Sequence, residues 1–219
     1  MRRNLADKRY VAIDGPPGAG ASALARRLAA VTGALLVEDP APQNPFLDDF
    51  AREPRQVAFQ TQTYCLLARY RQQVELAQPA LFEPAGAVAD YVFARDAMFA
   101  RITLTPEEYA LYVRIHTLLD AQLPLPDLVV YLTADRAVLR SRARRVLSAS
   151  ERVIKLGVID QLAAEMDEYF FAYEAGPLLV INTSDFDFVE HPNQLEELTD
   201  LIVKTRAGAH HYRPLQMPL

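Results

Sequence analysis

The sequence predicts an α/β protein in which a three-layer arrangement places helices on both faces of a parallel sheet. Short, continuously apolar runs alternate along the chain with longer segments of helical spacing. Continuous apolar runs are typical of strands buried on both faces, and parallel strands need the crossover helices that this alternation supplies. A glycine-rich turn between the first apolar run and the first helical segment is the third observation.

Five apolar runs are expected to form the strands, because each is short, rich in aliphatic residues and followed by polar or turn-forming residues. The run at 127–132 is the clearest of them, since Leu125-Pro126 precedes it and six residues of β-strand character follow. The expected strands span residues 9–14, 34–39, 86–91, 127–132 and 177–182.

The helices are expected between these strands, where start and stop signals frame the helical spacing. Ser22 followed by good helix formers opens the first helix, and Gly33 ends it. Thr105 as an N-cap, Pro106 at the first position and two glutamates after it open another. The expected helices span residues 22–32, 46–53, 54–78, 92–101, 105–122, 135–146, 156–173 and 193–205.

The length of 219 residues suits a single domain, which we place at 1–206. Residues 1–8 are charged and without periodicity, so a loose N-terminus is expected. A polar, irregular stretch at about 146–155 is a candidate lid, and residues 207–219 are expected to form an unstructured tail.

Composition narrows the possible function classes. Hydrophobic residues make up 51% and charged residues 23%, as in an ordinary globular protein. The net charge of −5 argues against broad nucleic-acid binding, and no apolar run is long enough to span a membrane. The chain shows no signal-peptide pattern and has one cysteine, Cys65, which fits a reducing cytoplasm and a buried apolar role. We therefore expect a cytoplasmic protein without a metal cage of His and Cys residues.

The turn after the first expected strand has the spacing of a phosphate-binding P-loop, G-x-x-x-x-G-x-S. In such loops backbone N–H groups cradle phosphates at the N-terminus of a helix, and a lysine precedes the serine. Here Ala21 stands at the lysine position. The candidate nucleotide-binding residues are Gly15, Gly18, Ala19, Gly20, Ala21 and Ser22.

Acidic residues lie at the ends of two further expected strands. Glu38 and Asp39 end the second strand, and Asp90 lies near the end of the third. Ligands of open α/β sheets bind beyond the carboxyl ends of the strands. These acids and the glycine-rich loop are therefore expected to face one crevice.

Several segments, in this order, resemble the deoxynucleoside kinase family, specifically its bacterial deoxyadenosine and deoxyguanosine kinase-like branch. The likeness covers about residues 9–205. It is carried by the loop Gly15–Ser22, Glu38-Asp39-Pro40 with Asn44-Pro45-Phe46-Leu47, Phe59-Gln60-Thr61-Gln62 with Arg69-Tyr70, Asp90-Tyr91 with Met98-Phe99-Ala100, Pro126–Leu132, and Asn182-Thr183-Ser184.

The resemblance implies transfer of a phosphoryl group from ATP to the 5′-hydroxyl of a deoxynucleoside, with Mg²⁺ as the metal. It implies that the Ser22 hydroxyl binds Mg²⁺ and that Asp39, with Glu38 beside it, is the general base. Gln62 is then the residue that pairs with the nucleobase, and a Gln satisfied within the protein is the alternative. Asp90 and Arg95 are further candidate substrate-binding residues.

Phe59 and the pair Arg142 and Arg144 are further candidates, and each has a simpler alternative interpretation. Phe59 either stacks on the nucleobase or belongs to the core. Arg142 and Arg144 either clamp the phosphates or lie on a solvated basic helix face. Arg26 and Arg27 lie a full turn into the first helix, and we expect them to point away from the phosphates.

The positive charge expected of a kinase is reduced at two places. Ala21 carries none, and apolar or small residues fill the centre of the lid at 146–150. Asp39 is also shorter than the glutamate usual in the family, and the acid–Arg–Ser signature after the third strand is replaced by Ala89-Asp90-Tyr91. We therefore expect a deoxynucleoside kinase-like protein with impaired or lost catalysis.

The alternative is a non-catalytic accessory subunit that keeps the kinase fold and binds protein partners in a larger complex, for which the tail offers a Tyr/Arg/Pro segment. Resemblance also implies a homodimer formed through the long helices 54–78 and 105–122. The sequence leaves open which base is preferred, which protein partner binds, and whether the chain turns over substrate.

Overall fold

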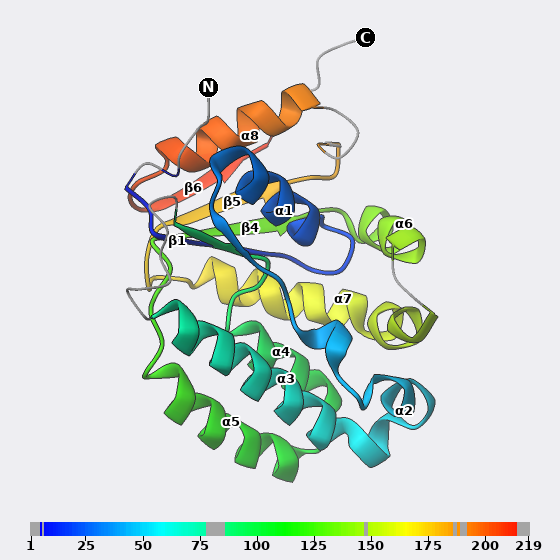
Figure 1. The fold of residues 1–219 in the computed structure, drawn as a ribbon. Coiled ribbons are helices and arrows are strands. Elements are labelled where there is room, and N and C mark those ends of the chain that lie inside the picture. Colours follow the sequence, from blue (N-terminus) through cyan, green and yellow to red (C-terminus); the bar gives the residue numbers. More distant parts are fainter. Residues whose placement is uncertain are drawn as a thin grey trace.

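A six-stranded parallel sheet forms the centre of the computed structural model, which describes residues 5, 7–77, 86–146, 149–185, 188 and 192–213 (Figure 1). The strand order is β2-β3-β1-β4-β5-β6, and every neighbouring pair is parallel. The strands are β1 (Tyr10–Asp14), β2 (Leu35–Val37), β3 (Ala87–Ala89), β4 (Leu128–Thr133), β5 (Leu178–Asn182) and β6 (Ala209–Tyr212).

The middle strand β1 sets the register of the sheet. Val11 pairs with Val88 of β3 on one side and with Leu128 of β4 on the other. The chain runs from β1 outward to β2, returns to β3, and then crosses β1 to reach β4. Because the direction of winding reverses beside β1, the loop after β1 opens at the place where such sheets bind ligands.

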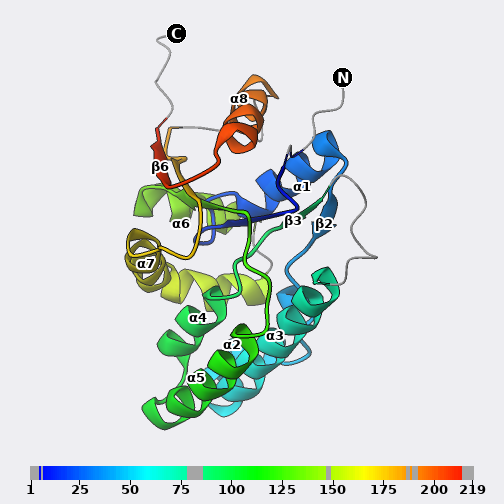
Figure 2. The same ribbon diagram turned by 90° about the vertical axis from the view of Figure 1, so that its left-hand side faces the viewer.

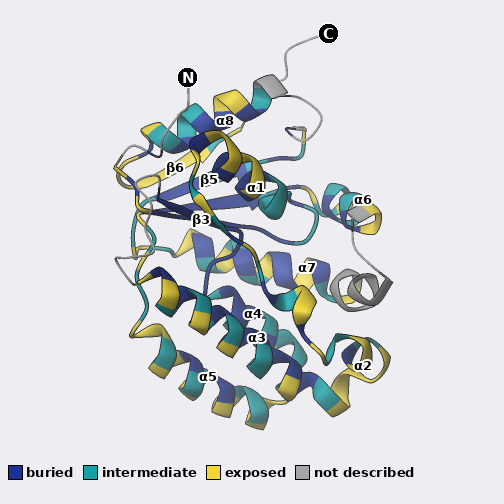
Figure 3. Ribbon diagram, viewed as in Figure 1, coloured by how far each residue is buried: buried dark blue, intermediate teal, exposed yellow. Residues whose placement is uncertain are grey.

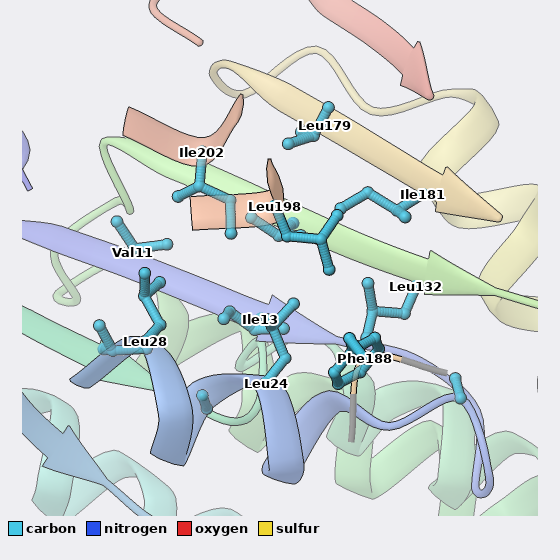
Figure 4. Packing of buried hydrophobic residues seen from close by; sticks show 14 of the residues in the cluster. Val11, Ile13, Leu24, Leu28, Leu132, Leu179, Ile181, Phe188, Leu198 and Ile202 are labelled. Atoms are coloured by element: carbon cyan, nitrogen blue, oxygen red, sulfur yellow. The ribbon is translucent and has the colours of Figure 1, made fainter. Parts of the chain in front are cut away.

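One face of the sheet is covered by α1 (Ala21–Thr32) and α8 (Pro192–Lys204), with α6 (Arg136–Val146) beyond the strand ends (Figure 1). Leu24 and Leu28 of α1 are fully buried against Val11 and Ile13 of β1, as Figure 4 shows. This face is the larger apolar core. This core holds α1, and with it the glycine-rich loop that precedes the helix, against the central strand β1.

The opposite face carries α7 (Ala149–Phe171) and, beyond it, a layer of three helices (Figure 2). Phe170 of α7 stacks on Tyr131 of β4 with ring centroids 4.2 Å apart. Leu66, Phe93 and Tyr112 form a smaller apolar cluster within the outer layer. The outer helices are α3 (Pro54–Leu76), α4 (Arg95–Thr103) and α5 (Pro106–Asp120), and η1 (Ala41–Gln43) and α2 (Leu47–Arg52) connect β2 to them.

The predicted class and most predicted elements are confirmed. The five expected strands are present, with β2 and β3 shorter than predicted, and the outer helices keep the predicted order. The start of α5 forms the expected cap: the Thr105 hydroxyl accepts from the Glu108 backbone N–H, and the Glu108 carboxylate accepts from that of Thr105. Figure 3 shows the buried residues concentrated in the sheet and on the helix faces turned toward it.

Three predicted boundaries are wrong. Residues 209–212 form β6 rather than an unstructured tail, because they pair in register with β5. α4 begins at Arg95 rather than at 92, and α7 begins at Ala149 rather than at 156. The polar residues of that segment were predicted as loop, although Glu, Arg and Lys are good helix formers.

The N-terminal segment is held more firmly than its charge pattern predicts. Leu5 is buried in the larger core, and Lys8 donates through Nζ to the carbonyl of Val203 at 2.9 Å. Residues 1–4 and 6 lie outside the described part.

Within the described part of the chain, no helix is both long and apolar enough to cross a bilayer.

The candidate lid at about 146–155 overlaps two helices. α6 ends at Val146 and α7 begins at Ala149, while residues 147 and 148 lie outside the described part. The lid therefore stays a prediction.

Candidate active site

A cavity of about 490 Å³ opens beyond the carboxyl ends of the strands. The loop Gly15–Ser22 forms one end of it, and side chains from α2, α3 and α4 form the other. Asp39 and Asp90 lie between the two ends. The three strand ends that the sequence predicts to converge do line this one cavity.

The loop conformation depends on glycine at two positions. Gly18 and Gly20 have φ angles of 91° and 99°, in the left-handed region that other residues seldom adopt. A Cβ atom on Gly18 would lie 2.3 Å from the carbonyl oxygen of Leu139 in α6. Gly20 is the N-cap of α1, so the free N–H groups at the start of this helix form an anion-binding site at the cavity wall.

Two side chains follow in the first turn of α1. Ala21, at the lysine position of the motif, lines the cavity with a methyl group only. Ser22 also lines the cavity, and its hydroxyl is hydrogen-bonded to the Asp90 carboxylate. Gly20 is the cap of α1, so the Ser22 hydroxyl does not cap the helix, and its partner is the Asp90 carboxylate.

Asp39 is held by two arginines. Arg69 of α3 donates to its Oδ1 from Nη2 at 2.7 Å and from Nε at 3.1 Å. Arg95, the first residue of α4, places Nη1 3.5 Å from the other oxygen. Burial would raise the pKa of Asp39, but the Arg69 and Arg95 guanidiniums outweigh it and lower that pKa to about 2. This carboxylate is therefore ionised and fixed in orientation.

Arg95 also connects Asp39 to the phosphate loop. Its Nη2 lies 3.1 Å from Asp14 Oδ1 and donates to the carbonyl of Gly15 at 3.2 Å. Asp14 is fully buried and accepts from the backbone N–H groups of Gly15 and Val92 at 2.7 and 2.9 Å. One arginine thus ties the end of β1, the loop and the end of β2 into a single network.

Arg69 has a second carboxylate partner, Asp96 of α4, which is fully buried and lines the cavity. Asp96 Oδ2 has no hydrogen-bond partner in the described part of the chain. Burial raises the pKa of Asp96 to about 6, against the opposing effect of Arg69. An unpartnered acceptor at this depth is suited to a donor group on a bound ligand.

Asp90 is the candidate group for a divalent cation together with Ser22. Its Oδ1 accepts from the backbone N–H of Asp39 at 2.5 Å, and burial raises its pKa, opposed by the Ser22 hydrogen bond. Four buried or mostly buried carboxylates face only two buried guanidiniums here, those of Arg69 and Arg95. The surplus negative charge fits Mg²⁺.

The described residues contain no group of three His, Cys, Asp or Glu side chains placed to enclose a metal. Mg²⁺ commonly takes one or two carboxylates and completes its shell with substrate phosphates and water. A hydroxyl and a single carboxylate beside an anion-binding loop agree with that mode of binding.

The end of the cavity away from the loop is largely apolar. Leu47, Phe50 and Phe99 line it, together with the thiol of Cys65. Gln62 is 5% exposed and donates from Nε2 to the Thr103 hydroxyl at 3.1 Å. The carboxamide of Gln62 is thus anchored by one contact inside an apolar chamber whose walls suit a flat ring.

Most of the predicted site residues meet at this cavity. The structure brings together the loop residues, Asp39, Gln62, Asp90, Arg95 and Arg142. Arg142 of α6 also donates to the Thr183 hydroxyl at 3.2 Å.

Three predicted residues lie elsewhere in the described part. Glu38 pairs with Arg26 at 2.8 Å, because neighbouring residues at a strand end point to opposite sides. Phe59 packs on the apolar cluster of the outer helices, and Arg144 is exposed. Among the described residues, the cavity lining includes Arg145 instead of Arg144, and it also includes Arg26, which the sequence predicted to point away.

The sequence reading assigned no role to Arg69, Asp96 or Asp14, although each holds the network together. Arg69 lies seven residues after Gln62 in one helix, two turns along the same face, and this spacing could have placed both in the cavity. Asp14 directly precedes the loop. The position of Asp96 in α4 carries no comparable signal.

Comparison with known proteins agrees with this geometry. The deoxynucleoside kinase family model matches residues 11–206. A deoxyguanosine kinase of Bacillus subtilis is 29% identical over 193 residues, covering 86% of this chain and 93% of that protein. A deoxyadenosine kinase of Dictyostelium discoideum is 26% identical, covering 86% of this chain and 77% of that protein.

A solved structure shares the fold. The deoxyadenosine kinase from M. mycoides with bound dATP superposes with a TM-score of 0.75 at 21% identity, over 88% of this chain and 98% of that one. Because the family match includes β2 to β5, most of β1, the loop and the arginine–carboxylate network, the chain belongs to the deoxynucleoside kinase family.

Proposed function

We propose that this chain binds ATP and a deoxynucleoside in the cavity and transfers the γ-phosphoryl group to the 5′-hydroxyl. The observation that carries the proposal is Asp39, an ionised carboxylate fixed by two arginines in the same cavity as the phosphate loop. The loop provides the anion site, and the apolar chamber with Gln62 provides a site for the base. The names of the relatives support this substrate class.

In the proposed reaction the 5′-oxygen forms a bond to the γ-phosphorus as the bond from that phosphorus to the β,γ-bridging oxygen breaks. The hydroxyl proton passes to Asp39, and the products are ADP and the nucleoside 5′-monophosphate. With a pKa of about 2, Asp39 is a weak base whose main contribution is to orient the hydroxyl. Such a role suffices because the transition state is loose and the nucleophile needs little activation.

Ser22 and Asp90 would hold Mg²⁺, which supplies charge neutralisation for the phosphates when bound. The Arg95 guanidinium keeps Asp39 and the Gly15 carbonyl in fixed relation, so the acceptor and donor ends of the cavity stay aligned. These residues would therefore orient both substrates.

We further propose that turnover is slow. Ala21 cannot stabilise charge on the transferring phosphoryl group, and removing one preorganised charge-stabilising group typically costs on the order of 10²–10³ in rate.

The alternative, a non-catalytic subunit of a larger complex, also has Ala21 in its favour. Against it stands the cost of the network: buried ionised groups destabilise a fold unless they are paired, and this cavity retains Asp14, Asp39, Asp90 and Asp96 together. Such a cluster is better explained by ligand binding than by a purely structural role.

A homodimer is the proposed assembly. Leu67 of α3 and Leu111 and Leu118 of α5 are 50%, 51% and 71% exposed, which places apolar side chains on the outer helix layer. Sedimentation velocity of the purified chain tests this, with a dimer mass as the expected result and a monomer mass at all concentrations as the contrary one.

The proposed activity is tested by incubating the purified chain with ATP, Mg²⁺ and each of the four deoxynucleosides, and separating the monophosphate product. Thermal unfolding with the same ligands is measured in parallel. We expect slow formation of one or two monophosphates and a rise in Tm with the same deoxynucleosides. If no product forms and no ligand raises Tm, the kinase function is excluded and the non-catalytic alternative remains.

A further inference from the structure

Arg26 lies in the cavity although the lysine of the phosphate loop is absent. It is four residues after Ser22 on α1, so the two side chains share one face of the helix. Long helical side chains lean back toward the N-terminus of their helix, so the loop lies within the direction that the Arg26 side chain can take. Arg27, the next residue, is exposed and is not among the described residues that line the cavity.

The position of the Arg26 guanidinium is set by Glu38. Nε donates to Glu38 Oε1 at 2.8 Å, and both side chains are more than half exposed, at 60% and 55%. Glu38 directly precedes Asp39, so this pair connects the phosphate-loop helix to the strand end that carries the proposed base. An exposed ion pair of this kind contributes little to stability and rearranges readily when a stronger anion arrives.

The charge balance of the cavity makes a cation at this place useful. The buried part carries Asp14, Asp39, Asp90 and Asp96 against Arg69 and Arg95, and both arginines are already engaged by carboxylates. A polyphosphate entering beside these groups meets surplus negative charge. The guanidinium of Arg26 offers a planar set of donors that suits phosphate oxygens, and its contact with Glu38 uses one edge of that set.

We propose that Arg26 supplies part of the positive charge that Ala21 lacks, by binding the transferring phosphoryl group from the second turn of α1, and that Glu38 acts as the positioning residue for it. This inference rests on the proposed function, because it requires a nucleoside triphosphate in the loop. Arg26 would leave Glu38 for the phosphate oxygens during transfer, so that no proton and no covalent bond changes on the arginine.

The test is a set of variants of the full chain: Arg26→Gln, Arg26→Lys, Ala21→Lys and the double variant with Ala21→Lys and Arg26→Gln. Arg27→Gln is the matched control, since it removes the same charge from the same helix outside the cavity. Both kcat and the affinity for ATP are measured, the latter by calorimetric titration without a deoxynucleoside.

We expect Arg26→Gln to lower kcat about 10²-fold and to weaken ATP binding, while Arg26→Lys retains most of both and Arg27→Gln stays within about twofold of the wild type. In the Ala21→Lys background the loss on removing Arg26 should shrink to within about threefold, because the lysine takes over the same charge. Deoxynucleoside binding should be unaffected throughout.

The inference is overturned if Arg26→Gln behaves like Arg27→Gln, or if removing Arg26 costs the same factor with and without the lysine. In either case, detectable turnover by the wild type leaves the proposed function intact. If wild type and Ala21→Lys both neither bind ATP nor form product, the proposed function fails as well. If ATP binds but no product forms, the ATP affinities of the same variants decide whether the inference about Arg26 holds.

Discussion

Asp39 is predicted to matter for the chemical step more than for binding of ATP. Replacing it with Asn removes the charged acceptor that orients the hydroxyl and takes up its proton, and keeps the shape of the side chain. We expect kcat to fall by about 10²–10⁴, with the affinity for ATP changed little because the loop lies on the other side of the network. Steady-state assays with ATP titration check this, and an unchanged kcat would remove Asp39 from the mechanism.

The same residue gives stability a dependence on pH. Its pKa is about 2 in the folded chain against a reference of 3.8, so the ion pairs with Arg69 and Arg95 stabilise the fold above pH 4. This contribution, about 2 kcal/mol, is lost as the pH falls from 4 through 2. Denaturant unfolding over this range should show the loss in the wild type and a smaller one in Asp39→Asn. Equal losses of unfolding free energy in the wild type and in Asp39→Asn would contradict the pairing of Asp39 with the two arginines.

Asp96 should affect substrate recognition in a range closer to neutral pH. Its raised pKa of about 6 means that it gains a proton as the pH falls below 6 and loses an acceptor from its cavity-facing side. At saturating ATP, we expect kcat/KM for the deoxynucleoside to decrease as the pH is lowered below 6. This break in the pH profile should be absent in Asp96→Asn. A break that persists in the variant would assign it to another group.

Some residues of the site could be predicted from the sequence because their place follows from strand geometry. Asp39 and Asp90 end buried strands, and parallel strands end at one edge. The helix-borne residues were harder. Gln62 was placed through resemblance, whereas Phe59, three residues earlier, packs on the outer helices. Arg26 lies a full turn into α1 and was predicted to point away, yet it lines the cavity, because a long helical side chain leans back toward the N-terminus of its helix.

At the scale of elements, the contact between the phosphate loop and α6 leads to a paired prediction. Gly18→Ala would place a Cβ atom 2.3 Å from a backbone oxygen of α6 as well as straining a positive φ angle. Gly33→Ala strains a similar φ angle of 76° at the end of α1, where the added Cβ atom would meet no other group of the described residues within 4 Å. We expect the control, Gly33→Ala, to lower the free energy of unfolding by about 1–2 kcal/mol.

Gly18→Ala should cost more in unfolding free energy and should also abolish the rise in Tm caused by ATP. Denaturant unfolding with and without ATP measures both effects. Equal losses in the two variants, with the ATP response kept in Gly18→Ala, would show that α6 does not fix the loop.

The edge strand β6 offers a second paired test. The Gly208 carbonyl accepts from Leu178 N–H of β5, and strand alternation turns the N–H of His210 to the same side and that of His211 away. His210→Pro should therefore lower Tm clearly more than His211→Pro, because only the former removes a ladder hydrogen bond. Activity should be unchanged in both, since β6 is not among the described elements that line the cavity.

The elements that could be predicted are those with a strong burial pattern. β1, β4 and β5 are apolar along most of their length, and α5 carries a complete capping box. β6 could not be predicted, because Ala209-His210-His211-Tyr212 lies at an exposed edge and its burial pattern gives no alternation. Its formation depends on pairing with β5, which is tertiary information.

For the molecule as a whole, the sheet order explains why distant segments form one site. β1, β2 and β3 deliver the loop, Asp39 and Asp90 to one edge, and the outer helices close the cavity over them with Arg69, Arg95 and Gln62. The scaffold and the residues proposed as the base and the metal ligands all lie at this cavity. The cavity departs from the family motif chiefly in the charge at Ala21.

The kcat of Ala21→Lys relative to the wild type, with ATP, Mg²⁺ and the deoxynucleoside that raises Tm most, tests this account most directly. The account predicts detectable turnover in the wild type and a rise of about 10²-fold on restoring the lysine, with the KM for the deoxynucleoside unchanged. No turnover in either protein, or equal kcat values in both, would contradict the claim that the site is a kinase site limited by the charge missing at Ala21.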